Sequence, residues 1–202
     1  LTVGLPPNLT AWTGVDALTH AIEAYIVPDF HPLCDGAAIE ALRLIGKYLV
    51  TSVEEPENLE ARGGMLVGSC LAGISFLKGL GFVHAISHMV GAEYDTQHGL
   101  TNAIVLPVVL RYNLPTLDNK CQHMADALSM SDKTSDGFIR EIEATLDRLS
   151  IPTSLNEIGV PFDCAGRIAE KAMHDSAALT NPVTGNVSDL EALVEMAIKK
   201  AR

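Results

Sequence analysis

The chain has 202 residues, of which 48% are hydrophobic and 19% are charged, so it can bury a substantial core and is not a disordered segment. Its formal net charge is −11, from 14 basic and 25 acidic side chains. That balance, with no basic stripe, excludes a surface built to contact nucleic-acid phosphates. No uninterrupted apolar run reaches the roughly 18 residues of a membrane helix, which excludes a membrane span.

The four cysteines lie far apart in the sequence and form no Cys-x-x-Cys pair. This spacing indicates reduced thiols in the core rather than a disulfide framework. No signal peptide is visible. We therefore expect a cytoplasmic protein with neither a nucleic-acid nor a membrane partner. The chain begins with Leu1 rather than Met, so we also expect it to be a fragment of a longer protein.

Apolar residues recur at helical spacing along most of the chain, and no segment alternates with the period of a strand. The first helix is expected to start at Thr10, as its N-cap residue, and to reach about Tyr25. Asp35 is expected to cap the second helix, and Pro56 to begin the third at its first turn. The third helix is rich in small residues, which let a neighbouring helix approach closely.

Residues 83–92 are expected to form a helix, followed by a loop through Gln97 and then a helix or an extended segment to Pro107. Four more helices are expected, at residues 117–128, 137–149, 163–174 and 188–200. The last carries a capping-box pattern, with Ser188 and Glu191 three positions apart. Aromatic residues are only 5% of the chain, and the sequence therefore predicts an all-α fold of closely packed helices.

Five polar residues in two distant segments have the spacing of a metal site. Asp16 and His20 are four residues apart, so on a helix they share one face. His84 and His88 repeat this spacing, and His98 follows a loop. One carboxylate and three imidazoles suit Fe²⁺ or Zn²⁺, and the donor types do not choose between the two. Magnesium and calcium would require more oxygen ligands.

Simpler interpretations of the same residues remain open. One Asp-His pair on a helix is more often a surface pair or a cap than a ligand pair, and histidines on an apolar helix can be satisfied by buried polar neighbours. Glu23 and Glu93 could receive the second N–H of a ligating imidazole, although a solvated carboxylate is the more common role.

The other three histidines, His31, His123 and His174, are expected to be surface or capping residues. The chain has no G-x-G-x-x-G loop after a strand, no P-loop, no H-E-x-x-H and no G-x-S-x-G. These absences leave the Asp and His segments as the sequence feature that points to chemistry.

These segments resemble the two signatures of the iron-containing (group III) alcohol dehydrogenases. Residues 14–23 resemble the first, and residues 81–99 with their continuation to Pro107 resemble the second. Arg111-Tyr112-Asn113 and Asn181-Pro182 also fit the pattern. Met89 and Gln97 depart from it, because proline is common at both places.

The resemblance implies the helical C-terminal domain of the dehydroquinate synthase-like fold, spanning residues 1–202. The N-terminal Rossmann-like domain, which holds NAD or NADP, would be absent from this chain. The resemblance also implies that Asp16, His20, His84 and His98 bind the metal. His88 would lie beside substrate and nicotinamide, as a catalytic and cofactor-binding residue.

The implied activity is hydride transfer between a small alcohol, or its aldehyde or ketone, and NAD(P). The cation would be Fe²⁺, with Zn²⁺ as the other candidate, and the protein would be a homodimer or a higher homo-oligomer. The fragment alone would be inactive. Three alternatives are related enzymes of the superfamily: a glycerol dehydrogenase, a maleylacetate reductase or a lyase like dehydroquinate synthase. A fourth is a non-catalytic helical metal-binding module.

Overall fold

The computed structural model describes residues 1–202 and is built from α-helices and short 3-10 turns, without a β-strand. This confirms the predicted all-α fold. The α-helices are α1 (Pro7–Ile26), α2 (Pro32–Glu54), α3 (Leu59–Ser75), α4 (Phe82–Tyr94), α5 (His98–Asn113), α6 (Asp118–Ala127), α7 (Ser135–Arg148), α8 (Ala165–Ala172) and α9 (Val187–Lys199).

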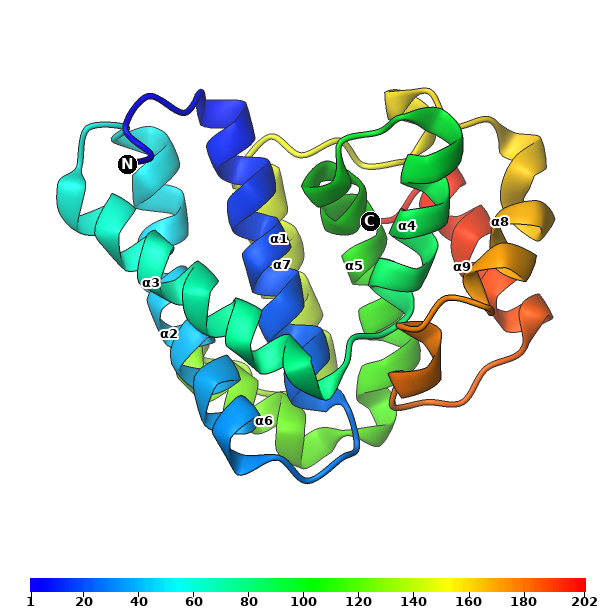
Figure 1. The fold of residues 1–202 in the computed structure, drawn as a ribbon, viewed down its shortest axis with the longest axis horizontal. Coiled ribbons are helices and arrows are strands. Elements are labelled where there is room, and N and C mark those ends of the chain that lie inside the picture. Colours follow the sequence, from blue (N-terminus) through cyan, green and yellow to red (C-terminus); the bar gives the residue numbers. More distant parts are fainter.

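Helix α1 lies between two groups of helices (Figure 1). On one side it packs against α2 and α3, which also pack against each other. On the other side it packs against α5, which in turn contacts α4, α7 and α9. The pair α8 and α9 closes the far end of the molecule, where α8 packs against α4. The two signature segments, on α1 and on α4–α5, are thereby brought together.

A single continuous core runs through all of these helices. Val15, Leu18 and Ile22 of α1 are fully buried at the helical spacing that the sequence shows. Helix α5 is buried on almost every side, because neighbours cover it all round, and Pro107 lies within it. The segment that could have been helical or extended is therefore a helix.

Two helices begin at other residues than the sequence predicted. Helix α1 begins at Pro7, three residues before Thr10, because proline is well tolerated in a first turn. The Thr10 hydroxyl instead bonds to the carbonyls of Leu5 and Pro6. Helix α3 begins at Leu59 rather than Pro56, since Asn58 accepts a hydrogen bond from the Ala61 N–H as its N-cap.

Two more caps differ from their predictions. The ring of His31, rather than Asp35, caps α2 by accepting from the Cys34 N–H, which confirms His31 as a capping residue. At α9 the capping box consists of Asn186 and Asp189, two residues ahead of the predicted pair Ser188 and Glu191. Asn186 has an extended backbone and can accept from the first free N–H groups.

Small residues allow α2 and α3 to lie close together, as predicted. A Cβ added to Gly64 would meet the Tyr48 ring at 2.1 Å, and one added to Gly68 would meet Ile45 at 2.9 Å. The ring and the branched side chain occupy the space that larger residues on α3 would need.

No single helix combines the length and apolar composition of a membrane span; only the pair 59–78 and 82–94, bent by 102°, meets both criteria together. All four cysteines are free thiols, as predicted. Cys34, Cys121 and Cys164 are buried, whereas Cys70 is exposed on α3 and is not the core thiol that was expected.

Candidate metal centre

Helices α1, α4 and α5 converge on a cluster of one carboxylate and three imidazoles. Asp16 and His20 come from α1, His84 from α4, and His98 from the first position of α5. One ligand atom from each lies within 4.8 Å of every other. The fold therefore brings together four of the five candidate residues and leaves His88 outside this set.

Close packing of α5 on α1 depends on Gly99. A Cβ at this position would lie 2.4 Å from the Trp12 carbonyl oxygen and 3.1 Å from the Asp16 Cβ. The first distance is too short for a side chain and involves backbone that cannot turn aside, and the second is a tight contact. Glycine therefore lets His98, its neighbour, reach the carboxylate of α1.

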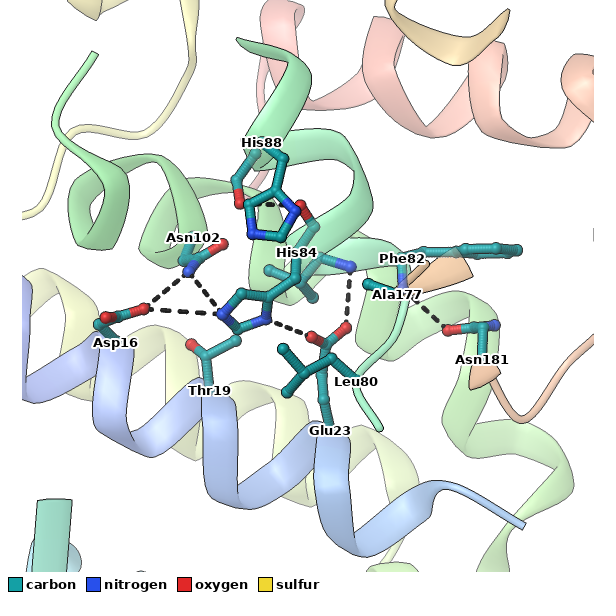
Figure 2. Close-up of polar contacts among 12 residues, drawn as sticks. Asp16, Thr19, Glu23, Leu80, Phe82, His84, His88, Asn102, Ala177 and Asn181 are labelled. Carbon is teal, nitrogen blue, oxygen red and sulfur yellow. Dashed lines mark hydrogen bonds and ion pairs between the residues drawn. The ribbon is translucent and has the colours of Figure 1, made fainter. Parts of the chain in front are cut away.

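The first turn of α4 is held by two side chains from distant parts of the chain. The buried carboxylate of Glu23 accepts the Val83 N–H at 2.8 Å, and the Asn181 side-chain oxygen accepts the Phe82 N–H at 3.1 Å. These contacts satisfy N–H groups that have no partner inside the helix. Figure 2 shows Glu23 reaching from α1 and Asn181 approaching from the opposite side.

The other oxygen of Glu23 fixes the orientation of His84. Glu23 Oε2 lies 2.6 Å from His84 Nδ1, and both side chains are almost fully buried. A carboxylate only accepts, so Nδ1 carries the proton and Nε2 presents its lone pair toward Asp16. Glu23 thus bonds to one of the candidate ligands, and the solvated role favoured from the sequence is wrong for this residue.

The rings and the carboxylate of the cluster approach one another closely. Asp16 Oδ1 lies 3.5 Å from His98 Nε2 and 3.8 Å from His84 Nε2. The His20 ring stacks on the His84 ring, with centroids 4.6 Å apart. The His20 ring also contacts Phe76, in the 3-10 turn η1 (Phe76–Lys78), with centroids 5.0 Å apart.

Asn102, one turn after His98 on α5, joins three of these residues and is fully buried. Its Nδ2 lies 2.7 Å from Asp16 Oδ1, 3.0 Å from His98 Nε2 and 3.1 Å from His84 Nε2. An amide nitrogen has two hydrogens for these three acceptors, while Asn102 Oδ1 is buried without any partner. Exchanging the two amide atoms would place an oxygen against the Asp16 carboxylate, so the electropositive nitrogen faces the lone pairs.

The electrostatics of the cluster favour a cation. Asp16 and Glu23 both face it, and neither forms an ion pair with a lysine or an arginine. Burial lowers the pKa of the His20 imidazole from 6.5 to about 4, although Asp16 partly opposes the shift. Burial also lowers the pKa of His98, again against the effect of Asp16. These two rings are neutral at pH 7 and cannot balance the carboxylates.

The residues fit a divalent cation. Three lone pairs already converge on one electropositive group, the Asn102 amide, and the two carboxylates have no lysine or arginine partner. A set of three imidazoles and one carboxylate is typical of zinc and ferrous iron. Asp16, His20, His84 and His98 could hold such an ion, with Glu23 orienting His84.

His88 lies on α4 one turn beyond His84, on the side away from α1 (Figure 2). Its ring stacks on His98 with centroids 5.5 Å apart, and its Nδ1 lies 2.9 Å from Asp175 Oδ2. His88 is therefore next to the cluster but bonded to another partner. The carboxylate of Glu93, also on α4, binds Arg167 and Lys171 at the surface, as the surface interpretation predicted.

The remaining histidines lie outside the cluster. The Nδ1 of His123, on α6, lies 2.8 Å from the Tyr25 hydroxyl, and His174 follows the end of α8. Neither Asn102 nor Asp175 was among the site residues predicted from the sequence. Asn102 could have been found from its four-residue spacing after His98, whereas Asp175 is 87 residues from its partner.

The sequence matches one known protein family over almost its whole length. Residues 10–198 match the family model described as "Fe-containing alcohol dehydrogenase family, C-terminal". The chain is 41% identical to the 1,3-propanediol dehydrogenase of Klebsiella pneumoniae, over 98% of this chain and 53% of that protein. It is 35% identical to the NAD-dependent methanol dehydrogenase of Bacillus methanolicus, over 98% of this chain and 54% of that protein.

The fold is also similar to a solved structure. A crystal structure of 1,3-propanediol oxidoreductase superimposes with a TM-score of 0.94 at 38% identity, covering 97% of this chain and 53% of that one. The chain thus spans about half the length of the relatives it matches.

Proposed function

Because this chain belongs to the iron-containing alcohol dehydrogenase family, we propose that it supplies the metal-binding half of an NAD(P)-dependent alcohol dehydrogenase. The reaction would transfer a hydride between a small alcohol and the nicotinamide, and in reverse would reduce an aldehyde or ketone. The relatives named as alcohol-type dehydrogenases support the reaction class.

The observation that carries this proposal is the convergence of four ligand atoms within 4.8 Å of one another, from three helices. Asp16, His20, His84 and His98 are the proposed ligands, with Fe²⁺ as the cation and Zn²⁺ as the other candidate. When bound, either ion would act as a Lewis acid that lowers the pKa of an alcohol hydroxyl.

The chain's own residues prepare the site in three ways. Glu23 holds His84 with its Nε2 lone pair toward the cluster, at 2.6 Å from Nδ1. Asn102 holds the Asp16 carboxylate at 2.7 Å. Gly99 lets α5 approach α1 so that His98 can join them. The half-exposed His88 and His98 rings mark the open side, where substrate and nicotinamide would meet.

The cofactor would be NAD or NADP, held mainly by a Rossmann-like domain outside these 202 residues. This part of the proposal is supported by relatives about twice as long as this chain, one of which is named as NAD-dependent. A cytoplasmic location and a homo-oligomeric state belong to the same proposal. The isolated chain should then bind a metal yet show neither strong NAD binding nor turnover.

The test uses the longer enzyme that would carry this chain, loaded with Fe²⁺ or Zn²⁺ and assayed for NAD(P)H formation with a series of small alcohols. His20→Ala should lose both bound metal and activity, because it removes an imidazole that no neighbour can replace. The control is His31→Ala, which removes an imidazole that only caps α2. Full metal content and activity in His20→Ala would count against the proposal.

A further inference from the structure

One largely covered carboxylate near the cluster, that of Asp175, has no place in the metal site. Asp175 lies in the turn between α8 and the 3-10 turn η5 (Ala178–Thr180), and its Oδ2 is 2.9 Å from His88 Nδ1. Its side chain is 12% exposed, whereas that of His88 is 39% exposed. Asp175 forms no ion pair with a lysine or an arginine. Its ion-pair partner is the His88 imidazole, when that ring is protonated.

The turn holds Asp175 in a fixed orientation. Its second oxygen, Oδ1, accepts the Ala177 N–H at 2.8 Å, and its backbone N–H bonds to the Ala172 carbonyl at the end of α8. The two oxygens thus have different partners, one in the turn and one in α4. A carboxylate constrained in this way can set the position of the ring that it contacts.

The hydrogen bond also decides where the proton of a neutral His88 lies. A carboxylate oxygen accepts but cannot donate, so the proton must be on Nδ1 and the lone pair on Nε2. The ring meanwhile lies nearly parallel to His98, at an interplanar angle of 16° and 5.5 Å between centroids. The His88 ring meets the His84 ring edge to face, with centroids 5.7 Å apart. His88 therefore has a defined tautomer and a defined plane beside the ligand set.

We propose that Asp175 is a positioning residue that makes His88 Nε2 the proton acceptor for the alcohol hydroxyl. In the oxidation direction the substrate O–H bond breaks, its electron pair stays on oxygen, and the proton bonds to Nε2. The carboxylate of Asp175 stabilises the imidazolium that results, as a buried aspartate does for a catalytic histidine elsewhere. The exposed edge of His88 then releases the proton to water.

This inference rests on the proposed dehydrogenase function, but its structural part can be tested without metal, cofactor or turnover. The chain is labelled with ¹⁵N-histidine and its imidazole nitrogens are observed by NMR above the titration range of histidine. His88→Gln identifies the His88 signals. In the wild type we expect a protonated Nδ1 and an unprotonated Nε2 on His88.

Asp175→Asn is the informative variant, because its amide oxygen can still accept the Ala177 N–H and keep the turn. The amide NH₂ would then face Nδ1 and donate to it, which forces the proton onto Nε2. We expect the His88 tautomer to invert in this variant. Asp163→Asn is the matched control, since Asp163 is exposed in the 3-10 turn before α8 and the substitution makes the same charge change.

Two further variants separate positioning from folding. Asp175→Glu keeps the carboxylate and should restore the wild-type tautomer at least in part, whereas Asp175→Ala should leave a mixture. In the metal-loaded enzyme, Asp175→Asn should retain its metal and lose about 100-fold in kcat with a smaller change in KM. If the substitution instead disturbed the metal site, the enzyme would lose bound metal together with its activity.

The proposal is overturned if wild-type His88 carries its proton on Nε2, or if Asp175→Asn leaves the tautomer unchanged. Either result can occur while the cluster still binds metal, so the proposed function would survive it. Conversely, a chain that binds no metal could still show the inverted tautomer, and only the dehydrogenase assignment would then fail.

Discussion

Replacing Glu23 with glutamine tests how the fold prepares His84 for a metal. The two carboxylate oxygens accept from two separate donors, the Val83 N–H at 2.8 Å and His84 Nδ1 at 2.6 Å. Glutamine has nearly the same shape but only one accepting oxygen. Its NH₂ group must therefore face one of these donors, or His84 must move its proton to Nε2.

Both results should weaken metal binding. If His84 changes tautomer, the proton on Nε2 occupies the lone pair that points at Asp16 and Asn102. If it does not, a buried charge-assisted hydrogen bond is lost, at a cost of about 1.5–3 kcal/mol in the free energy of unfolding. For a chain of this size that corresponds to a fall in Tm of roughly 3–12 °C. Losing an outer partner of a ligand typically lowers metal affinity about 10- to 100-fold.

The assay is a competition titration of Zn²⁺ or Fe²⁺ against a chelator, with thermal unfolding of the metal-free chain alongside. Glu93→Gln is the matched control, because Glu93 forms ion pairs with Arg167 and Lys171 of α8 and makes no contact with the cluster. It should lower stability by less than about 1 kcal/mol and leave metal affinity unchanged. A folded Glu23→Gln chain that binds metal as tightly as the wild type would refute the reasoning.

Three other perturbations have defined outcomes. Asn102→Leu should lower the free energy of unfolding of the metal-free chain by about 1–3 kcal/mol. The metal-loaded chain should lose less, because an imidazole lone pair that binds the metal no longer accepts from the Asn102 amide. Equal losses in thermal unfolding with and without Zn²⁺ would contradict this. In the metal-free chain the pKa of His20 is about 4, below its unfolded 6.5, so the unfolded state protonates first as pH falls. Stability is then full above pH 6.5 and lost toward pH 4, by up to about 3 kcal/mol, and a His20→Asn chain should show a flatter profile of Tm against pH. Gly99→Ala should lower the free energy of unfolding by about 1–3 kcal/mol and reduce metal content, because its Cβ meets the Trp12 backbone. Gly63→Ala is the control, because a Cβ there has open space and should not destabilise the chain. Equal Tm changes in the two variants would argue against close α1–α5 packing.

Helix periodicity gave reliable information because it reflects burial along one element. The spacing of Asp16 and His20 on one face of α1 could be read directly, and so could the helix that carries His84. Helix starts could not, because Thr10 and Pro56 compete with other residues nearby that can begin a helix equally well. The shifted starts of α1 and α3 come from that local competition.

The side chains that contact helix α4 and its histidines could not be predicted from the sequence, for a different reason. Glu23 lies three residues after His20, and the same carboxylate would be solvated if α4 did not begin beside it. Asn181 and Asp175 reach α4 from 99 and 87 residues away, through a fold that no local spacing encodes. Burial of a polar side chain by a distant segment decides its role, and periodicity carries no information on this.

The most direct test of the account is metal content by elemental mass spectrometry, on protein purified anaerobically without chelator. Wild type is compared with His84→Ala and with His31→Ala, which changes only a helix cap. We expect about one iron or zinc per chain in the wild type and in His31→Ala, and none in His84→Ala. Metal retained in His84→Ala, or a wild-type chain that takes up neither ion when loaded, would contradict it.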